Sequence, residues 1–149
     1  MSFLLDTDVV SEIRKQAPDA GVAGWFASVP ADRLFLSFLV VGEIRQGIER
    51  LARRDPAKAE IFERWLSQLL DGYGDRLVPI TDRIAQAWGR LNVPDPVPVV
   101  DGLMAATAPV HDLTLVTRNV SDVRSTGVRL LNPFSGGSEP GHGNTASSE

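Results

Sequence analysis

Short apolar runs alternate with longer amphipathic stretches along most of this chain. Runs of mostly apolar residues, typical of strands buried on both faces of a parallel sheet, occur at 3–5, 34–36, 77–80 and 113–117. A fifth run at 128–131 predicts a last strand. Strands that alternate with helices predict an α/β sandwich with a mostly parallel central sheet.

The stretches between these strands carry helix caps and helical periodicity. From Val40, apolar residues recur at i, i+4, i+8 and i+11, which is the stripe of a core-facing helix over 39–54, capped by Ser37. Asp55-Pro56 predicts the start of the next helix, which should run to about residue 70. Asp82 is expected to cap another helix, which runs through Trp88 to Leu91. The remaining expected helices cover 9–15, 19–29 and 99–108, the last ending or kinking at Pro109.

Composition indicates one ordinary folded domain. The 149 residues are 43% hydrophobic and 23% charged, which is typical of a soluble protein with a single core. No cysteine is present, so disulfides and thiolate metal sites are excluded. No secretion signal is recognised, and no segment approaches the roughly 20 apolar residues of a membrane span, so we expect a cytoplasmic protein. Residues 1–134 should form the domain, and 135–149 a disordered tail.

The charge pattern bears on nucleic-acid binding. A net charge of −4 argues against a large basic face, but it does not exclude an enzyme whose acids are neutralised by a metal. Thirteen of the fifteen basic residues are arginines. Arg50 and Arg54 lie seven and eleven residues after Glu43, on the same helix face, and are candidate RNA contacts. The plainer interpretation is a solvated helix face.

Four acidic residues stand where a parallel sheet would bring them together. Asp6 ends the first strand, Glu43 lies on the helix after the second, Asp101 lies in the first turn of a small-residue helix, and Asp122 follows the fourth strand. Ligands bind beyond the carboxyl ends of such strands, so we expect these acids to converge there. Each has a plainer explanation. Asp6 could be a helix cap, Glu43 a solvated residue, Asp101 a helix-dipole partner and Asp122 a turn residue.

Several unpaired carboxylates at one point predict a cation site. They would raise one another's pKa values, and a divalent cation removes that cost. An all-oxygen set suits Mg²⁺ or Mn²⁺ rather than zinc. Such a metal activates water and polarises a phosphoryl oxygen, which makes phosphodiester hydrolysis the natural reaction class. The sequence contains neither G-x-S-x-G nor a phosphate-cradling glycine loop.

Four blocks of sequence carry a resemblance to a known family. They are LLDTDVVSE at 4–12, LSFLVVGEIRQGI at 36–48, DGLMAATA at 101–108, and LVTRNVSDV with LLNPF at 115–123 and 130–134. In this order and spacing the chain resembles the PIN-domain ribonucleases, and among them the VapC-like toxins, including the FitB-like branch. The resemblance implies a three-layer α/β/α sandwich and an endoribonuclease that acts as the toxin of a type II toxin–antitoxin pair.

The resemblance also implies roles for the acids. Asp6 and Asp101 would be direct ligands of Mg²⁺ or Mn²⁺, and Glu43 and Asp122 would complete the shell or act through water. The polar positions Thr117 and Asn119 also match the family and would support the site. Asp8 stands where asparagine is common in the family and would add a negative charge beside the metal.

Partners too are implied only by the resemblance. The substrate would be RNA, and the chain would form a homodimer. It would assemble as a hetero-oligomer with a small VapB/FitA-like antitoxin and would reach DNA only through that antitoxin. No membrane partner is expected.

Two other functions compete with this hypothesis. The start FLLDTDVV also fits a haloacid-dehalogenase-like phosphatase with Asp6 as nucleophile and Asp8 as acid/base, but the only lysines are Lys15 and Lys58, and that chemistry needs a late one. The second alternative is a catalytically silent PIN-like subunit that only binds partners. The intact acid set argues against it.

Overall fold

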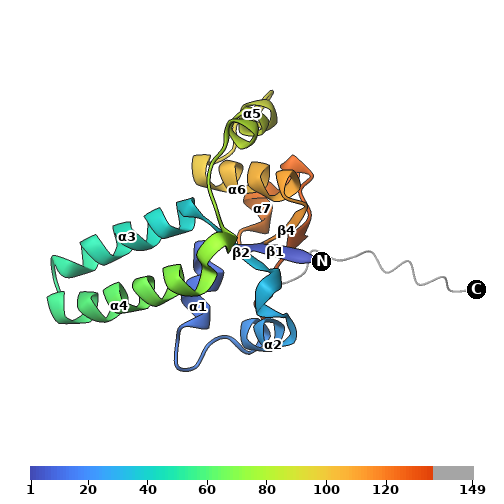
Figure 1. The fold of residues 1–149 in the computed structure, drawn as a ribbon. Helices are drawn as coiled ribbons and strands as arrows, with labels where there is room; N and C mark the ends of the chain where they lie inside the picture. The colour runs from blue at the N-terminus through green and yellow to red at the C-terminus, as the bar shows by residue number, and fades with distance from the viewer. Residues whose placement is uncertain (136–149) are drawn as a thin grey trace, which may run out of the picture.

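A single sheet of five parallel strands lies at the centre of the molecule, in the order β3-β2-β1-β4-β5 (Figure 1). The computed structural model describes residues 1–135. The strands are β1 (Ser2–Leu5), β2 (Leu34–Ser37), β3 (Leu77–Val78), β4 (Leu113–Val116) and β5 (Leu130–Leu131). The first strand occupies the middle, because Leu5 pairs with Leu36 of β2 and with Val116 of β4. All three of these residues are fully buried, as a sheet covered on both faces requires.

Helices cover both faces of this sheet and confirm the expected α/β/α architecture. In Figure 1, α1 and α2 lie on one side of the sheet and α6 and α7 on the other, while α3 and α4 form a hairpin that extends away from it. The helices are α1 (Thr7–Ile13), α2 (Ala20–Ser28), α3 (Phe38–Ala52), α4 (Pro56–Tyr73), α5 (Asp82–Leu91), α6 (Val99–Val110) and α7 (Val120–Val123). No helix within residues 1–135 is long and apolar enough to cross a membrane.

Polar N-caps fix where the helices begin. Ser37 and Asp55 cap α3 and α4 through their side-chain oxygens, as the sequence predicts. Two predicted starts were wrong. Asp6 itself caps α1, so that helix begins at Thr7, and the cap of α5 is Thr81 rather than Asp82. Asp6 lies three residues before the predicted first residue of α1, and Thr81 lies directly before Asp82. Both have the extended backbone and the side-chain acceptor that a cap needs.

The C-terminal third differs from the predicted elements at two places. Helix α6 continues past Pro109 to Val110, where the proline removes only one hydrogen bond near the end of the helix. After β4, where the sequence analysis considered Asp122 as a turn residue, the chain forms α7, followed by a 3-10 turn at Arg124–Thr126. A four-residue helix leaves no periodic pattern in the sequence, which is why it was missed.

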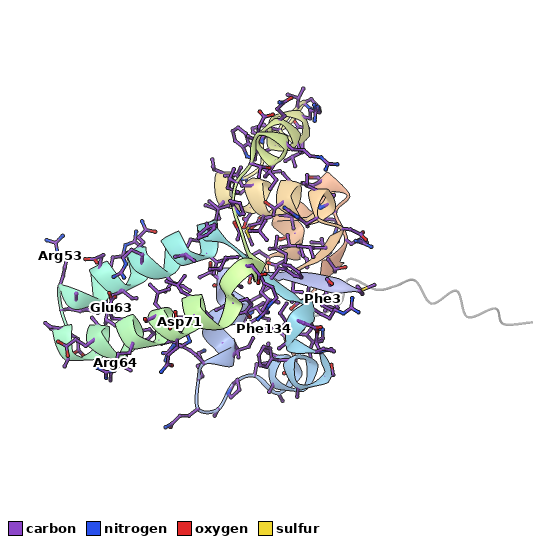
Figure 2. The ribbon with its side chains drawn as sticks, in the orientation of Figure 1. Phe3, Arg53, Glu63, Arg64, Asp71 and Phe134 are labelled. Atoms are coloured by element: carbon purple, nitrogen blue, oxygen red, sulfur yellow. The ribbon has the colours of Figure 1, made fainter. Side chains whose placement is uncertain are left out.

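The end of the described chain is tied to α2. Phe134 returns to the centre of the molecule and is 6% exposed (Figure 2). Ser135, which we expected in the tail, donates hydrogen bonds from its backbone nitrogen and its hydroxyl to Asp19, at 2.9 and 2.5 Å. The predicted disorder of the tail otherwise falls on residues 136–149, which lie outside the described residues.

Candidate active site

Asp6 lies at the point where β1 ends and α1 begins. Its backbone nitrogen extends the sheet by donating to the Val116 carbonyl at 3.0 Å. Its Oδ1 accepts from the Val9 nitrogen at 3.0 Å as the cap of α1, and its Oδ2 accepts from the Thr117 hydroxyl at 2.5 Å. The cap that we offered as the plainer explanation is therefore real, and it fixes the carboxylate at the edge of the sheet.

The environment of Asp6 disfavours its charged form. Burial raises the pKa of the Asp6 carboxyl to about 6. The hydrogen bonds from Thr117 and Val9 pull that pKa down by less, and the negative charges of Asp8 and Asp101 push it up further. A carboxylate with this balance gains from any cation placed beside it.

Asp101 faces the same region from the first turn of α6. Burial raises the pKa of its carboxyl, and the charges of Asp122, Glu43 and Asp8 raise it further, in that order. The start of α6 is held close to its neighbours at Gly102, where an added Cβ would lie 2.7 Å from the Val97 side chain and 3.2 Å from Trp88. The small residue thus allows the close packing that places Asp101.

Glu43 reaches the site from α3 and is fixed by Thr7, a residue that no sequence pattern singled out. The Thr7 hydroxyl donates to its Oε1 at 2.6 Å, which joins the start of α1 to α3. Glu43 and Asp8 are exposed, whereas Asp6 and Asp101 are half-buried. The only sequence signal for Thr7 is its position directly after Asp6.

Thr117, Asn119 and Asp122 complete this edge of the sheet. The Thr117 hydroxyl donates to Asp6 and accepts from the Asn119 backbone nitrogen at 3.0 Å. The Asp122 nitrogen donates to the Asn119 carbonyl at 3.3 Å, within the short turn of α7. Thr117 is 3% exposed, so its hydroxyl is a buried link between Asp6 and the segment that carries Asp122.

No basic side chain within residues 1–135 forms a salt bridge with any of the five carboxylates at this edge, which are those of Asp6, Asp8, Glu43, Asp101 and Asp122. The salt bridges within residues 1–135 involve other acids, namely Glu12, Glu49, Glu63 and Asp112. In the same part of the chain, no three His, Asp or Glu side chains are positioned to hold one metal ion as they stand. The donor set nevertheless fits Mg²⁺ or Mn²⁺, because it is all oxygen, negatively charged and partly withdrawn from water. The half-buried Asp6 and Asp101 are the residues best placed to hold such an ion.

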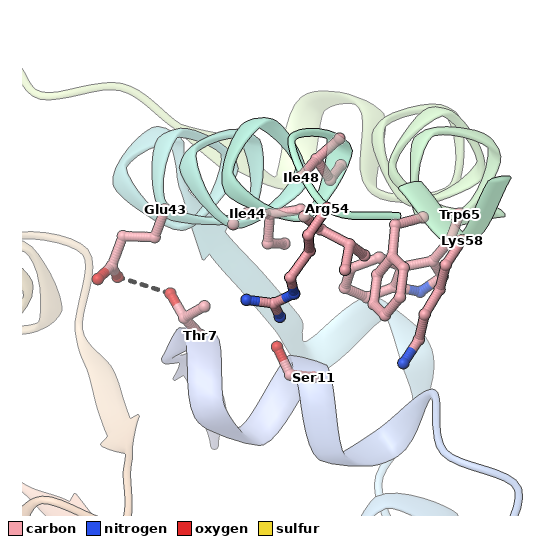
Figure 3. A pocket seen from close by; sticks show the side chains of 11 residues that line it. Thr7, Ser11, Glu43, Ile44, Ile48, Arg54, Lys58 and Trp65 are labelled. Atoms are coloured by element: carbon pink, nitrogen blue, oxygen red, sulfur yellow. Dashed lines mark hydrogen bonds between the residues drawn. The ribbon is translucent and has the colours of Figure 1, made fainter. Parts of the chain in front are cut away.

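A cavity of about 340 Å³ adjoins these acids between α1, α3 and α4 (Figure 3). Thr7 and Glu43 lie at one part of its wall, and Arg54 and Lys58 project into it. The rest of its lining is largely apolar: Ser11, Ile44, Gly47, Ile48, Leu51, Phe62 and Trp65. Of the two arginines predicted to contact RNA, Arg54 lines this cavity and Arg50 does not.

Comparison with known proteins places the chain in a family. The family model for the PIN domain matches residues 3–121, which include Asp6, Asp8, Glu43 and Asp101. The chain belongs to the PIN-domain family. This membership confirms the resemblance found in the sequence and leaves no support for the dehalogenase-like alternative.

Curated PIN-domain relatives match over nearly their full length. Toxin FitB of Neisseria gonorrhoeae is 29% identical over 137 residues, covering 89% of this chain and 98% of the relative. The VapC ribonuclease Y4jK of Sinorhizobium fredii is 31% identical over 143 residues, covering 89% and 97%.

Solved structures of this family share the fold. FitAcB from Neisseria gonorrhoeae has a TM-score of 0.81 at 28% identity, covering 88% of this chain and 97% of that one. FitAB bound to an IR36 DNA fragment has a TM-score of 0.80 at 27% identity, covering 89% and 96%. VapBC2 from Rickettsia felis bound to a promoter DNA fragment shares the fold at a TM-score of 0.69 and 20% identity, covering 89% and 98%.

Proposed function

We propose that this PIN-domain chain is an endoribonuclease that depends on Mg²⁺ or Mn²⁺ and acts as the toxin of a toxin–antitoxin pair. The observation that carries the proposal is a group of five carboxylates at the carboxyl edge of the sheet, in which the charges of neighbouring acids disfavour the ionised forms of Asp6 and Asp101. The five come from four segments of the chain and have no basic partner within residues 1–135. Such a group suits a divalent cation and the hydrolysis of a phosphodiester.

The role that we assign to each residue of the site follows from its burial. Asp6 and Asp101 hold the cation, and Thr117 keeps the Asp6 carboxylate in one orientation. When bound, the cation supplies Lewis acidity toward a phosphoryl oxygen and lowers the pKa of water. Thr7 occupies Glu43 Oε1, which leaves Oε2 to accept a proton or a hydrogen bond from water at the exposed rim. Asp8 and Asp122 add negative charge that draws the cation to this edge.

The comparisons support the biological role. One relative is named a ribonuclease and another a toxin, and similar structures are FitAB and VapBC complexes, two of them bound to DNA. By this analogy the chain binds a small VapB/FitA-like antitoxin, contacts operator DNA only through it, and forms a homodimer. With RNA as its substrate, the chain acts in the cytoplasm.

Sequencing of RNA 5′ ends after brief induction tests this function. We expect new ends with the wild-type chain and none with Asp101→Asn, because this change removes a cation ligand while keeping the side-chain size. The loss of cleavage by the purified variant should exceed the roughly 10–100-fold cost of an outer-shell change. Asp112→Asn is the matched control, because Asp112 is exposed and pairs with Arg129 away from the acids. Equal sets of ends from wild type and Asp101→Asn would refute metal-dependent cleavage.

A further inference from the structure

The cavity beside the acids combines positive charge, aromatic surface and direct access to the site. We propose that it binds the single strand of RNA adjacent to the scissile phosphate, with Arg54 and Lys58 contacting backbone phosphates. This inference rests on the proposed ribonuclease function. It adds a binding path for the substrate and two residues that position it, of which Lys58 was not singled out in the sequence.

Charge favours RNA as the occupant. Neither Arg54 nor Lys58 forms a salt bridge with another residue in the described range 1–135. Arg45, on α3 and nine residues before Arg54, is instead held by Glu49 and by a two-point contact with Glu63 at 2.7 and 2.9 Å. These basic residues therefore have different roles, because Arg45 joins α3 to α4 while the charges of Arg54 and Lys58 remain available to an anion.

Shape favours a single strand over a duplex. A volume of about 340 Å³ is at the small end of ligand pockets, which suits one unpaired nucleotide rather than a helix of paired ones. Gly47 leaves the wall open on α3, since an added Cβ there would meet no atom within 4 Å. Phe62 and Trp65 supply aromatic surface, with ring centroids 6.3 Å apart. The bases of a single strand stack on aromatic side chains with little dependence on the nucleotide sequence.

The cavity also leads to the acids. Glu43 and Thr7, which are bonded to each other, line it together with Arg54 and Lys58 (Figure 3). Helix α3 extends nine residues beyond Glu43, to Ala52, which is about 13 Å at the rise of an α-helix. Arg54 follows the end of this helix, and its side chain lies in the cavity between Glu43 and Lys58. A strand held by Arg54 and Lys58 therefore passes Glu43 on its way to Asp6 and Asp101.

Binding of a short fluorescein-labelled single-stranded oligoribonucleotide tests this path. All proteins carry Asp101→Asn, so that the probe is not cut. Arg54→Gln with Lys58→Gln should raise the Kd at least about tenfold and reduce the slope of log K against log salt by about 1.4, or 0.7 for each lost phosphate contact. Arg53→Gln with Arg64→Gln is the matched control, because these residues do not line the cavity and point away from the body of the molecule (Figure 2).

A second variant tests the space itself. Gly47→Phe fills the cavity without changing charge and should weaken RNA binding, whereas Gly24→Phe, on α2 and equally free of neighbours within 4 Å, should not. Unchanged affinity and salt slope in the Arg54/Lys58 double variant would overturn the proposal and leave a protein segment as the occupant. Cleavage by the chain with Asp101 intact is measured in parallel. Binding that depends on Arg54 and Lys58 without any cleavage would refute the nuclease function and keep the RNA path.

Discussion

At the scale of single residues, one buried hydroxyl links the parts of the candidate site. Thr117 donates to Asp6 and accepts from the Asn119 backbone, and it is nearly inaccessible to water. The sequence marked Thr117 and Asp6 as matching family positions, because motif residues can be recognised one by one. It could not show the hydrogen bond between them, since 111 positions separate the two residues. It also missed Thr7, whose bond to Glu43 depends on how two helices pack.

Thr117→Val should weaken the response to metal without unfolding the protein. The change keeps the shape but removes the donor to Asp6, so the concentration of Mg²⁺ that gives half-maximal cleavage should rise about tenfold or more. Titration of cleavage rate with Mg²⁺ measures it. Thr114→Val is the matched control, because Thr114 lies in β4, just before Thr117, and its buried hydroxyl has no hydrogen-bond partner. An equal shift in both variants would assign the effect to β4 packing.

The lowered pKa of Asp19 predicts how the free energy of unfolding changes at low pH. Hydrogen bonds from the Ser135 hydroxyl, the Ser135 backbone and the Val22 backbone lower the pKa of its carboxyl to about 2. Because the folded pKa lies below the unfolded one, the stabilisation is complete above about 3.8 and is lost as the pH falls toward 2. Urea unfolding between pH 5 and pH 2 should therefore show a steeper loss for wild type than for Asp19→Asn. Parallel curves would show that the contact with Ser135 does not stabilise the fold.

At the scale of helices and strands, the sequence predicted most elements and missed those without periodicity. The apolar stripe from Val40 and the start at Asp55-Pro56 identified α3 and α4. The caps Asp6 and Thr81 start α1 and α5 two residues and one residue earlier than predicted, because extended residues just before a helix are indistinguishable from its first turn in the sequence. Helix α7 has only four residues, so tertiary packing rather than a local pattern defines it. The last strand was predicted over 128–131, and β5 occupies the second half of that range.

The two glycines of α2 should respond oppositely to alanine. At Gly21 an added Cβ would collide with the Pro133 carbonyl and lie 2.6 Å from the Ser135 nitrogen, so Gly21→Ala should lower the free energy of unfolding by about 1–3 kcal/mol. At Gly24 it would meet nothing within 4 Å, so Gly24→Ala should raise it by up to about 1 kcal/mol through helix propensity. Urea denaturation of both variants checks this. If Gly21→Ala is also stabilising, the chain end does not pack on α2 as described.

At the scale of the whole molecule, the parallel sheet gathers acids that lie far apart in the chain. The sequence predicted this gathering from one rule, that ligands bind beyond the carboxyl ends of parallel strands. It could not predict the cavity between α1, α3 and α4, because its walls come from three helices whose angles no sequence pattern specifies. The mutual repulsion of the acids is likewise a property of the assembled fold.

Divalent cations should stabilise the folded protein as a whole. Repulsion among the acids opposes folding, and a cation that binds only the folded form adds about 2.7 kcal/mol at 100 times its Kd. Mg²⁺ should therefore raise the Tm, whereas Na⁺ at equal ionic strength should not. Asp101→Asn should reduce the Mg²⁺ effect. A Tm that responds equally to both salts would mean that general screening, and no specific site, is responsible.

The central position of β1 has a consequence for the nascent chain on the ribosome. Asp6 is synthesised 111 residues before its hydrogen-bond donor Thr117, which directly follows β4, the neighbour of β1 in the sheet. A polypeptide still in synthesis therefore lacks the Thr117 link of the candidate cation site until β4 and Thr117 have emerged. If the chain cleaves RNA, the translating ribosome is protected from this activity until Thr117 has emerged and can bond to Asp6.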